Sequence, residues 1–358
     1  MRKHNFSAGP GALPLSVLEE AAANLVDHHG SGLSLMEMSH RTPGFESILF
    51  EARETIARLY GLPDSHEVLF LQGGASLQFA MVPYNLGQGA YINTGVWSQK
   101  AIEEARRIGP ATEVWSAKAG GFRDCPSPET TFDVAEGTKY LHLTTNNTIY
   151  GTQWRHVPEA SVPLVADLSS DFLSEPVALD KFDLVYAGAQ KNAGPSGVTV
   201  VIGKRDVLRS FTGAESVPTI LRYKTQAEND SMYNTPNTFG IYLVGLVAKW
   251  VRDNGGLVGA RERAVAKSAA LYRVIDNHPE VYRGHAAPAS RSRMNVTWNL
   301  VDDSRQKALL AEADRRGIIG LKGHRLVGGL RASIYNAVPE TSVQALIDLL
   351  NDFAAGKV

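Results

Sequence analysis

The chain has 358 residues, of which 44% are hydrophobic and 20% are charged, as in an ordinary globular protein with a large buried core. Its 36 basic and 37 acidic residues give a net charge of −1, which argues against a broad nucleic-acid-binding surface. The single cysteine excludes an internal disulfide and a paired-cysteine metal site, and we expect no bound metal.

The sequence indicates neither a signal peptide nor a membrane span. Arg2-Lys3-His4 precedes polar and small residues instead of the apolar run of a signal peptide. No apolar stretch approaches the ~18 residues of a membrane span, so we expect a cytoplasmic protein without a membrane partner.

The first elements along the chain are predicted to be helices. Ser16-Val-Leu-Glu19 has the pattern of a capping box and predicts a helix that runs towards His28. Apolar residues from Phe45 onwards recur at helical spacing, and Gly61 is a natural helix end.

The middle of the chain alternates between short apolar runs and helical patterns. Such strands suit a mainly parallel, mixed sheet with helices on both faces, which is an α/β fold. The predicted strands are 68–71, 90–93, 139–144, 162–166, 182–187 and 198–202, with helices at 77–85 and 97–108.

The last third of the chain has a different pattern of predicted helices and strands. Two long helices, at 239–253 and 257–277, are followed by half-exposed strands at 293–300 and 330–335. Helices are predicted at 305–315 and 341–353. We therefore predict a large domain over residues 16–258 and a smaller α+β domain over 259–358, with residues 1–15 packing against the small domain.

Two neighbouring strands deliver polar residues at their ends. Asp167 ends the run that begins at Val162, and the run from Phe182 continues into small residues and Lys191. Open α/β folds bind ligands at the carboxyl edge of the sheet. A lysine beyond a strand is, taken alone, most often a surface residue. Here Asp167 and the small neighbours favour a pyridoxal-phosphate site, where the lysine is the nucleophile and an acid holds the pyridine nitrogen protonated.

A glycine-rich turn and a tryptophan are further candidates. Gln72-Gly-Gly-Ala-Ser76 joins a predicted strand to a helix, where backbone N–H groups and the helix dipole can hold a phosphate. The same residues also suit an ordinary turn. Trp97 is either a core residue or a ring that stacks on a cofactor. The chain has no nucleotide-binding glycine motif in a suitable context.

Two His-Arg pairs are the most unusual feature of the sequence. They are His40-Arg41 and His324-Arg325, and Arg331 follows the second pair. Arginine binds carboxylate and phosphate oxygens in bidentate fashion, so a converging set suits a small ligand with several negative charges. Either pair considered singly is also typical of an exposed turn.

Over nearly its whole length the chain resembles the phosphoserine aminotransferases, which are class V, fold-type I pyridoxal-phosphate enzymes. The resemblance rests on Asn5-Phe-Ser-Ala-Gly-Pro10, Ala189-Gln-Lys-Asn192, Tyr233-Asn-Thr-Pro236, the His-Arg pairs and Arg331-Ala-Ser-Ile-Tyr-Asn-Ala337. It implies a homodimer and transfer of the amino group between L-glutamate and 3-phosphohydroxypyruvate. Some members also act on a four-carbon phosphorylated keto acid in pyridoxine biosynthesis, and the sequence leaves that open.

The resemblance also implies residue roles. Lys191 forms the aldimine, and Asp167 pairs with the ring nitrogen. Trp97 stacks on the ring, and Thr148 donates to the 3-hydroxyl oxygen. The cofactor phosphate is held by Ala75, Ser76 and Gln190, and by Asn234 and Thr235 of the second subunit. Arg331 binds the substrate α-carboxylate, and His40, Arg41, His324 and Arg325 bind the substrate phosphate, some of them across the interface.

One departure and several alternatives remain. Pro43 stands where family members often have a polar or basic residue, and we expect it to stiffen the loop that carries the first His-Arg pair. The nearest alternatives are a serine–glyoxylate aminotransferase and a cysteine desulfurase, for which Cys125 is poorly placed. A metal-dependent hydrolase lacks its ligand motifs here, and a non-catalytic binding protein has little use for Lys191 with Asp167.

Overall fold

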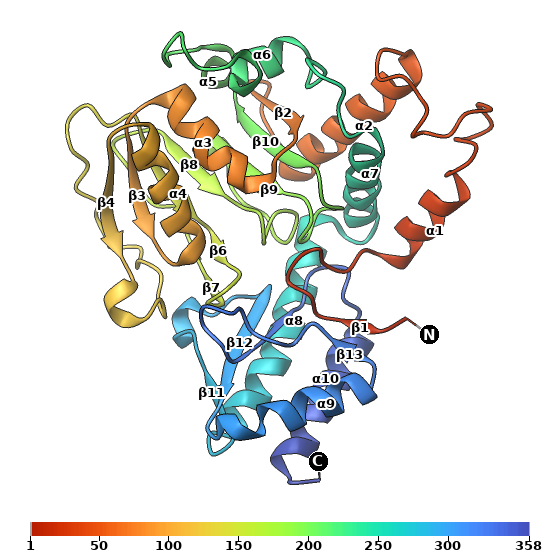
Figure 1. The fold of residues 1–358 in the computed structure, drawn as a ribbon, viewed down its shortest axis with the longest axis vertical. Coiled ribbons are helices and arrows are strands. Elements are labelled where there is room, and N and C mark those ends of the chain that lie inside the picture. Colours follow the sequence, from red (N-terminus) through yellow and green to blue (C-terminus); the bar gives the residue numbers. More distant parts are fainter. Residues whose placement is uncertain (1, 358) are drawn as a thin grey trace.

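The computed structural model describes residues 2–357. A large α/β part, at the top of Figure 1, contains a seven-stranded sheet of order β2-β10-β9-β8-β5-β3-β4. β10 is antiparallel to both of its neighbours, and all other neighbouring strands are parallel. The strands are β2 (His66–Leu71), β3 (Gly89–Asn93), β4 (Ala111–Ser116), β5 (Tyr140–Thr144), β8 (Leu164–Asp167), β9 (Leu184–Gly188) and β10 (Thr199–Lys204).

Helices cover both faces of this sheet. Successive side chains of a strand point to opposite faces. Accordingly Phe70 and Val185 pack in the core with α2 and α7, while Leu69 and Tyr186 pack in a second core with α3 and α4. The predicted α/β class with a mainly parallel, mixed sheet is therefore confirmed. The helices of this part are α1 (Leu15–Ala23), α2 (Pro43–Tyr60), α3 (Gly74–Leu86), α4 (Val96–Ile108), α5 (Arg205–Arg209), α6 (Tyr223–Glu228) and α7 (Thr238–Asp253).

The two N-terminal helices begin differently from the prediction. α2 starts at Pro43, two residues before the first apolar residue of the pattern, and Gly61 ends it with φ 58°. Proline suits the first position of a helix because its missing N–H has no partner there in any case. Pro43 is thus a helix residue, and the expectation that it stiffens a loop is wrong. α1 starts at Leu15 without a side-chain cap and ends at Ala23, so the capping box at Ser16 is wrong.

The predicted strands of the sheet are confirmed, but the sequence reading missed β4. This strand is parallel to β3 at the edge of the sheet. Its residues Ala-Thr-Glu-Val-Trp-Ser are exposed or half-buried. Unlike β2 at the opposite edge, which is mostly buried, β4 has little buried surface and therefore lacks the continuous apolar run that predicted the other strands.

A smaller α+β part lies at the bottom of Figure 1 and follows the 22-residue helix α8. Its three-stranded sheet has the order β11-β12-β14, and β1 pairs with β13 in parallel. Phe6 is buried in the core of this part. The division near residue 258 stays a prediction. The elements are β1 (His4–Asn5), α8 (Gly256–Asn277), β11 (Tyr282–Gly284), β12 (Asn295–Leu300), α9 (Gln306–Arg315), β13 (Ile318–Ile319), β14 (Leu330–Ser333) and α10 (Glu340–Ala354).

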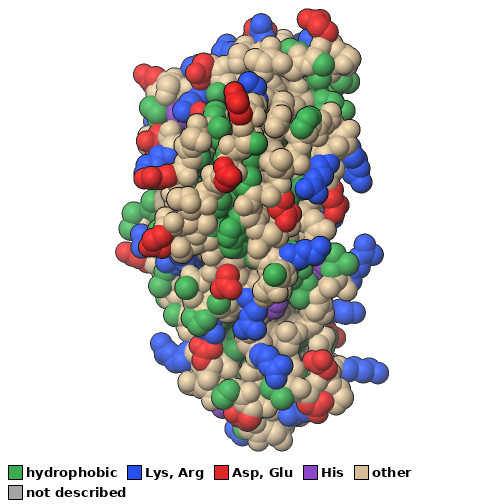
Figure 2. Space-filling model, turned by 90° about the vertical axis from the view of Figure 1, so that its left-hand side faces the viewer, with side chains coloured by type: hydrophobic (Ala, Val, Ile, Leu, Met, Phe, Trp, Pro, Cys, Tyr) green, Lys and Arg blue, Asp and Glu red, His purple; other side chains and the backbone are tan. Residues whose placement is uncertain are grey.

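Two further observations concern possible partners. Within residues 2–357, no helix combines the length and the apolar character needed to cross a membrane. On the face shown in Figure 2, acidic and basic side chains are interspersed, in keeping with the net charge of −1.

Candidate active site

The parallel strands bring the predicted residues to one edge of the sheet. β8 ends at Asp167 itself, and β9 ends at Gly188, shortly before Lys191. β5 ends at Thr144, before the turn that carries Thr148, and Trp97 lies at the start of α4 after β3. Because carboxyl ends of parallel strands meet at the same edge, residues far apart in sequence gather there.

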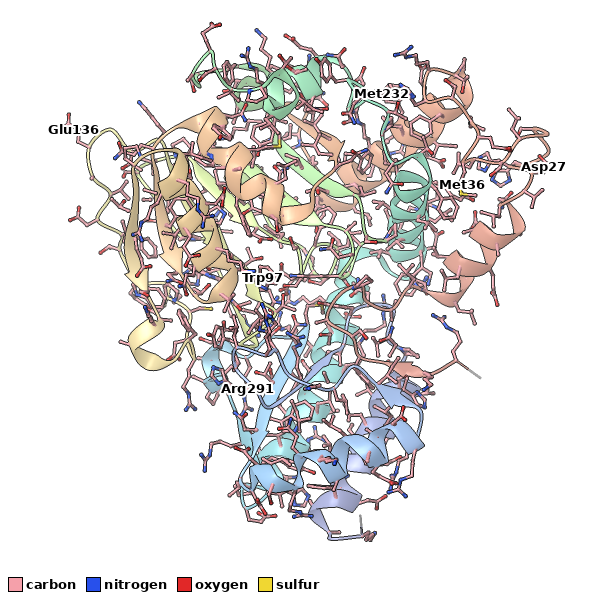
Figure 3. All side chains as sticks on the ribbon, in the orientation of Figure 1. Asp27, Met36, Trp97, Glu136, Met232 and Arg291 are labelled. Atoms are coloured by element: carbon pink, nitrogen blue, oxygen red, sulfur yellow. The ribbon has the colours of Figure 1, made fainter. Side chains whose placement is uncertain are left out.

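Lys191 lies at the centre of this group. Its Nζ donates a hydrogen bond to Thr148 Oγ1 at 2.8 Å and lies 4.9 Å from the centre of the Trp97 ring. Arg331, on β14 of the small part, donates from Nη1 to the carbonyl oxygen of Thr148 at 3.2 Å. Figure 3 places Trp97 where the large and small parts meet. The site therefore lies between the two parts of the chain.

The surroundings of Lys191 favour a nucleophilic amine. Burial lowers the pKa of Lys191 to about 8, and the Arg331 charge acts in the same direction. The carboxylate of Asp167 opposes this effect without cancelling it. An amine whose pKa is close to neutral is unprotonated in a useful fraction of molecules, as a covalent nucleophile requires.

Asp167 is the acidic counterpart of this lysine. Its side chain is buried, and burial raises its pKa, while Lys191 and hydrogen bonds from Ser169 act in the opposite direction. The backbone N–H of Ser169 donates to Asp167 Oδ1 at 2.8 Å. A buried carboxyl group of this kind is a strong partner for a cationic ring nitrogen, because the positive charge favours its ionised form.

The start of α3 offers donors for a phosphate. Gly73 caps the helix with φ 86° and without a side-chain hydrogen bond, so the chain turns directly from β2 into α3. The first N–H groups of a helix have no acceptor within it, and here they belong to Gly74, Ala75 and Ser76. The N–H groups and the helix dipole together form an anion-binding position.

Gln190 lies beside this edge as well. Its carbonyl oxygen accepts a hydrogen bond from the Gly11 N–H at 2.8 Å, which ties the N-terminal segment to the lysine loop. Its side chain folds over Gly188, where a Cβ atom would lie 2.8 Å from Gln190 Oε1.

The residues at this edge fit pyridoxal phosphate. They supply an amine, a buried carboxyl group, an indole ring and a helix start, which match the aldehyde, ring nitrogen, ring face and phosphate of that cofactor. Within residues 2–357, three buried nitrogen atoms near the site have no hydrogen-bond partner: Trp97 Nε1, Asn147 Nδ2 and Arg331 Nε. Buried donors without partners are costly, and bound ligands commonly satisfy them.

The second His-Arg pair lies beside the site, but the first does not within one chain. Burial lowers the pKa of His324, and the charges of Arg331, Arg325 and Lys100 add to the effect. Arg41 is exposed, and the nearest partner of its backbone N–H is Ser39 Oγ at 3.3 Å. Its segment lies at the right of Figure 1, beyond α7. The four residues of the two pairs therefore do not converge in a single chain.

Asn234 and Thr235 contact the β2–α3 turn of their own chain. The side chain of Gln72 donates to the carbonyl oxygen of Thr235 at 3.2 Å. Asn234 also lines a cavity of about 120 Å³ together with Gln72 and Leu77. Their predicted action on the cofactor of a second subunit stays a prediction.

Sequence reasoning missed two residues that support the site. Lys100 Nζ lies 4.9 Å from the centre of the Trp97 ring, and the spacing of three residues on a helix was the signal. Asn192 donates to the carbonyl oxygen of Phe172 at 2.7 Å and accepts from the N–H of Asn336 at 2.8 Å. It thereby fixes the chain directly after Lys191.

Comparison with known proteins identifies the family. The model of the family "Aminotransferase class-V" matches residues 3–346. A phosphoserine aminotransferase from Lysinibacillus sphaericus is 51% identical and covers 98% of each chain. The solved phosphoserine aminotransferase from Bacillus circulans subsp. alkalophilus superposes with TM-score 0.96 at 46% identity, covering 100% of this chain and 99% of its own. A pyridoxal-phosphate-bound phosphoserine aminotransferase from Trichomonas vaginalis matches with TM-score 0.90 at 34% identity, covering 98% and 100%.

The coverage is essentially complete in both directions. The chain belongs to the class V aminotransferases, in their phosphoserine aminotransferase branch.

Proposed function

We propose that the protein uses pyridoxal phosphate to transfer the amino group between L-glutamate and 3-phosphohydroxypyruvate, giving 2-oxoglutarate and O-phospho-L-serine. The observation that carries the proposal is the position of Lys191, which contacts Thr148 and Trp97 beside the buried Asp167. The names of the relatives support the choice of substrate.

The chain's own residues would hold the cofactor as follows. Asp167 pairs with the ring nitrogen, Trp97 covers the ring, and Thr148 Oγ1 donates to the ring hydroxyl oxygen. The phosphate is held by Ala75, Ser76 and Gln190, with Asn234 and Thr235 of a second subunit. The cofactor supplies a ring that accepts the electron pair left at the substrate Cα.

Lys191 then serves as the proton carrier. Its amine has a pKa of about 8, so at neutral pH it can take the proton from the substrate Cα and return it at the C4′ position of the cofactor. The hydrogen bond to Thr148 orients the amine between these positions. Arg331 binds the substrate α-carboxylate, and partial burial strengthens this charged pair because little water competes for it.

The substrate phosphate, or the distal carboxylate of glutamate, is bound by His324 and Arg325 together with His40 and Arg41 of a partner subunit. Within one chain the His40 pair lies away from the site, and a homodimer brings it there. The same segment carries apolar side chains in solvent, with Val26 82% and Met36 59% exposed. Exposed apolar patches mark contact surfaces, and we assign this one to the second subunit. We place the enzyme in the cytoplasm.

The alternatives account for fewer of these features. A cysteine desulfurase needs a reactive thiolate, but burial raises the pKa of Cys125 to about 12. A serine–glyoxylate aminotransferase acts on substrates without a phosphate group and has no use for the cationic cluster around His324. Among residues 2–357, no three side chains of His, Cys, Asp or Glu form a group that could hold a metal ion.

Half-reactions test the substrate assignment. The holoenzyme is mixed with O-phosphoserine, serine or glutamate, and the absorbance of the cofactor is followed. Phosphoserine should react with a kcat/KM about 100-fold or more above that of serine, because serine leaves these cations without their anionic partner, and the loss of such a charged pair costs about 2–5 kcal/mol. Equal efficiency with serine and phosphoserine would contradict the phosphate site.

A further inference from the structure

The hydroxyl group of Thr145 lies between two oxygen atoms. Thr145 Oγ1 is 2.6 Å from Asp171 Oδ1 and 3.1 Å from the backbone carbonyl oxygen of Asp167. A hydroxyl group has one hydrogen to donate, and a carbonyl oxygen can only accept. Both contacts are linear hydrogen bonds at once only if Asp171 carries a proton and donates it to Thr145, which then donates to Asp167.

The surroundings of Asp171 favour this protonated form. Asp171 is 8% exposed, and the charges that act on it most strongly are the carboxylates of Glu175 and Asp167. Burial, the largest effect, and these charges raise the pKa of Asp171 to about 7, against the hydrogen bonds from Thr145 and Gln153. The weakest of its contacts is the 3.4 Å hydrogen bond from Gln153 Nε2 to Oδ2.

The cations nearby are engaged elsewhere. Arg293 forms an ion pair with Glu175 at 2.6 Å, and Arg155 donates to Gln153 Oε1 at 2.9 Å. Lys191 donates to Thr148. A cavity of about 620 Å³, lined by Thr145, Asp171 and Glu175 among others, borders the group. Among residues 2–357, Asp171 therefore has no dedicated cationic partner that would hold it ionised.

We propose that Asp171 is a positioning residue that keeps its proton up to near-neutral pH and, through Thr145, fixes the end of β8 that carries Asp167. The backbone N–H of Thr145 also donates to the Asp167 carbonyl oxygen, at 3.0 Å. Thr145 therefore binds this carbonyl oxygen through both its backbone and its side chain.

Protonation of Asp171 also limits the negative charge at the site. An ionised Asp171 would act on Lys191 in the same direction as Asp167 and raise the pKa of its amine. With Asp171 neutral, Asp167 is the single carboxylate beside the cofactor position. This catalytic consequence rests on the proposed function, whereas the protonation state of Asp171 does not.

Infrared spectroscopy tests the protonation state directly. The difference spectrum of the wild-type holoenzyme, acidic minus alkaline, should contain the C=O stretch of a buried carboxylic acid that titrates near pH 7. The band should be absent from D171N and shifted in T145V, which removes the hydroxyl partner. A spectrum without such a band, or a band unchanged in D171N, would overturn the proposal even if transamination is confirmed.

Matched variants separate positioning from mere packing. D171L has a similar size but cannot donate to Thr145, and it should lower kcat/KM and shift the pH at which the absorbance of the bound cofactor changes. D171N can donate from its amide and should restore both to within about threefold of wild type. Equal losses in D171N and D171L would show that the enzyme needs the ionised carboxylate, against the proposal.

Unfolding of the same variants gives a readout that needs no cofactor. The pKa of folded Asp171 is raised above that of an exposed aspartate, so its contribution to stability is present at acid pH and lost as pH rises to about 7. D171N has no such group. Its Tm should therefore rise relative to that of wild type between pH 4 and pH 7, and a constant difference over this range would contradict a protonated Asp171.

Discussion

At the scale of single residues, burial changes the chemistry of Lys191. Its amine lies next to Trp97 and Thr148, and the lowered pKa suits the nucleophile and proton carrier that we propose it to be. The sequence identified Lys191 and Asp167 as strand-end residues. It could not show the pKa of either, because that depends on packing between segments far apart in the chain.

Removing the amine should abolish turnover but not all cofactor binding. Lys191→Ala should bind pyridoxal phosphate more weakly, through Asp167, Trp97 and the start of α3, and lose transamination. The measurement is the absorbance spectrum with added cofactor, together with turnover of phosphoserine. Normal turnover in this variant would exclude Lys191 from catalysis.

The cofactor-free protein should show the cost of burying this amine. The pKa of Lys191 falls from 10.5 to about 8 on folding, so the folded state is penalised while the amine is charged. Stability therefore rises with pH between about 8 and 10.5, where the unfolded chain still binds the proton. Lys191→Met should be more stable than wild type near pH 7, by about 2–3 kcal/mol, and this gain should shrink towards pH 10.5.

Denaturant unfolding of both proteins across this pH range measures the difference. Lys204→Met is a suitable control, because Lys204 is half-buried but forms an ion pair with Asp183 at 2.8 Å. A stability gain in Lys191→Met that does not change with pH would contradict the lowered pKa.

At the scale of elements, the turn between β2 and α3 is tightly constrained. Gly73 has φ 86°, and an added Cβ would lie 2.5 Å from the Cβ of Leu77. Gly73→Ala should therefore destabilise the fold by about 1–3 kcal/mol and weaken cofactor binding, because the helix start that holds the phosphate must shift.

Gly87→Ala is the matched control for this prediction. Gly87 has nearly the same φ, 89°, but its added Cβ would lie no closer than 3.8 Å to the side chain of Lys139. The Gly87→Ala substitution should lower stability through backbone strain alone and leave the cofactor dissociation constant unchanged. Similar weakening of cofactor binding by both substitutions would argue against a phosphate site at the start of α3.

The elements also show what sequence patterns can and cannot reveal. Buried central strands such as β8 and β9 consist mainly of apolar residues and were predicted, as were α7 and α8. The edge strand β4 was missed because exposed Thr112 and Glu113 interrupt its pattern. Of the site, the strand-end residues were predicted from the chain itself, and the roles of Thr148 and Gln190 came only through the family resemblance.

At the scale of the whole molecule, the proposed binding of the substrate phosphate by both His-Arg pairs needs a second subunit. Within one chain His324 and Arg325 lie beside Arg331, and the loop with His40 and Arg41 extends away from it. Pairs this far apart in sequence carry no pattern that reports whether they meet within a chain or across an interface. The expectation that some of these residues act across an interface therefore came only through the family resemblance.

Subunit mixing tests this arrangement. Lys191→Ala and Arg41→Ala homodimers should each be nearly inactive with phosphoserine, Arg41→Ala by about 2–5 kcal/mol in kcat/KM. After unfolding together and refolding, hybrid dimers contain one site with an intact Lys191 and an intact Arg41 from the partner. About a quarter of wild-type activity should return at equal mixing, because half of the dimers are hybrids.

Two controls complete the mixing experiment. The first control is a mixture of Lys191→Ala with Arg331→Ala, which can regain activity only if Arg331 acts across the interface. Because Arg331 contacts Thr148 of its own chain, we expect no recovery of activity in this mixture. Light scattering should give twice the chain mass of 38.8 kDa. No recovery in the Arg41 mixture would place Arg41 in its own chain's site or outside the mechanism.

The central claim is that Lys191 binds the cofactor covalently. The measurement that tests it most directly is borohydride reduction of the holoenzyme followed by digestion and mass spectrometry. We expect the pyridoxyl-phosphate mass on the peptide that contains Lys191 and on no other lysine, including Lys100 and Lys267. A modified lysine elsewhere, or no modification of a holoenzyme that turns over phosphoserine, would contradict it.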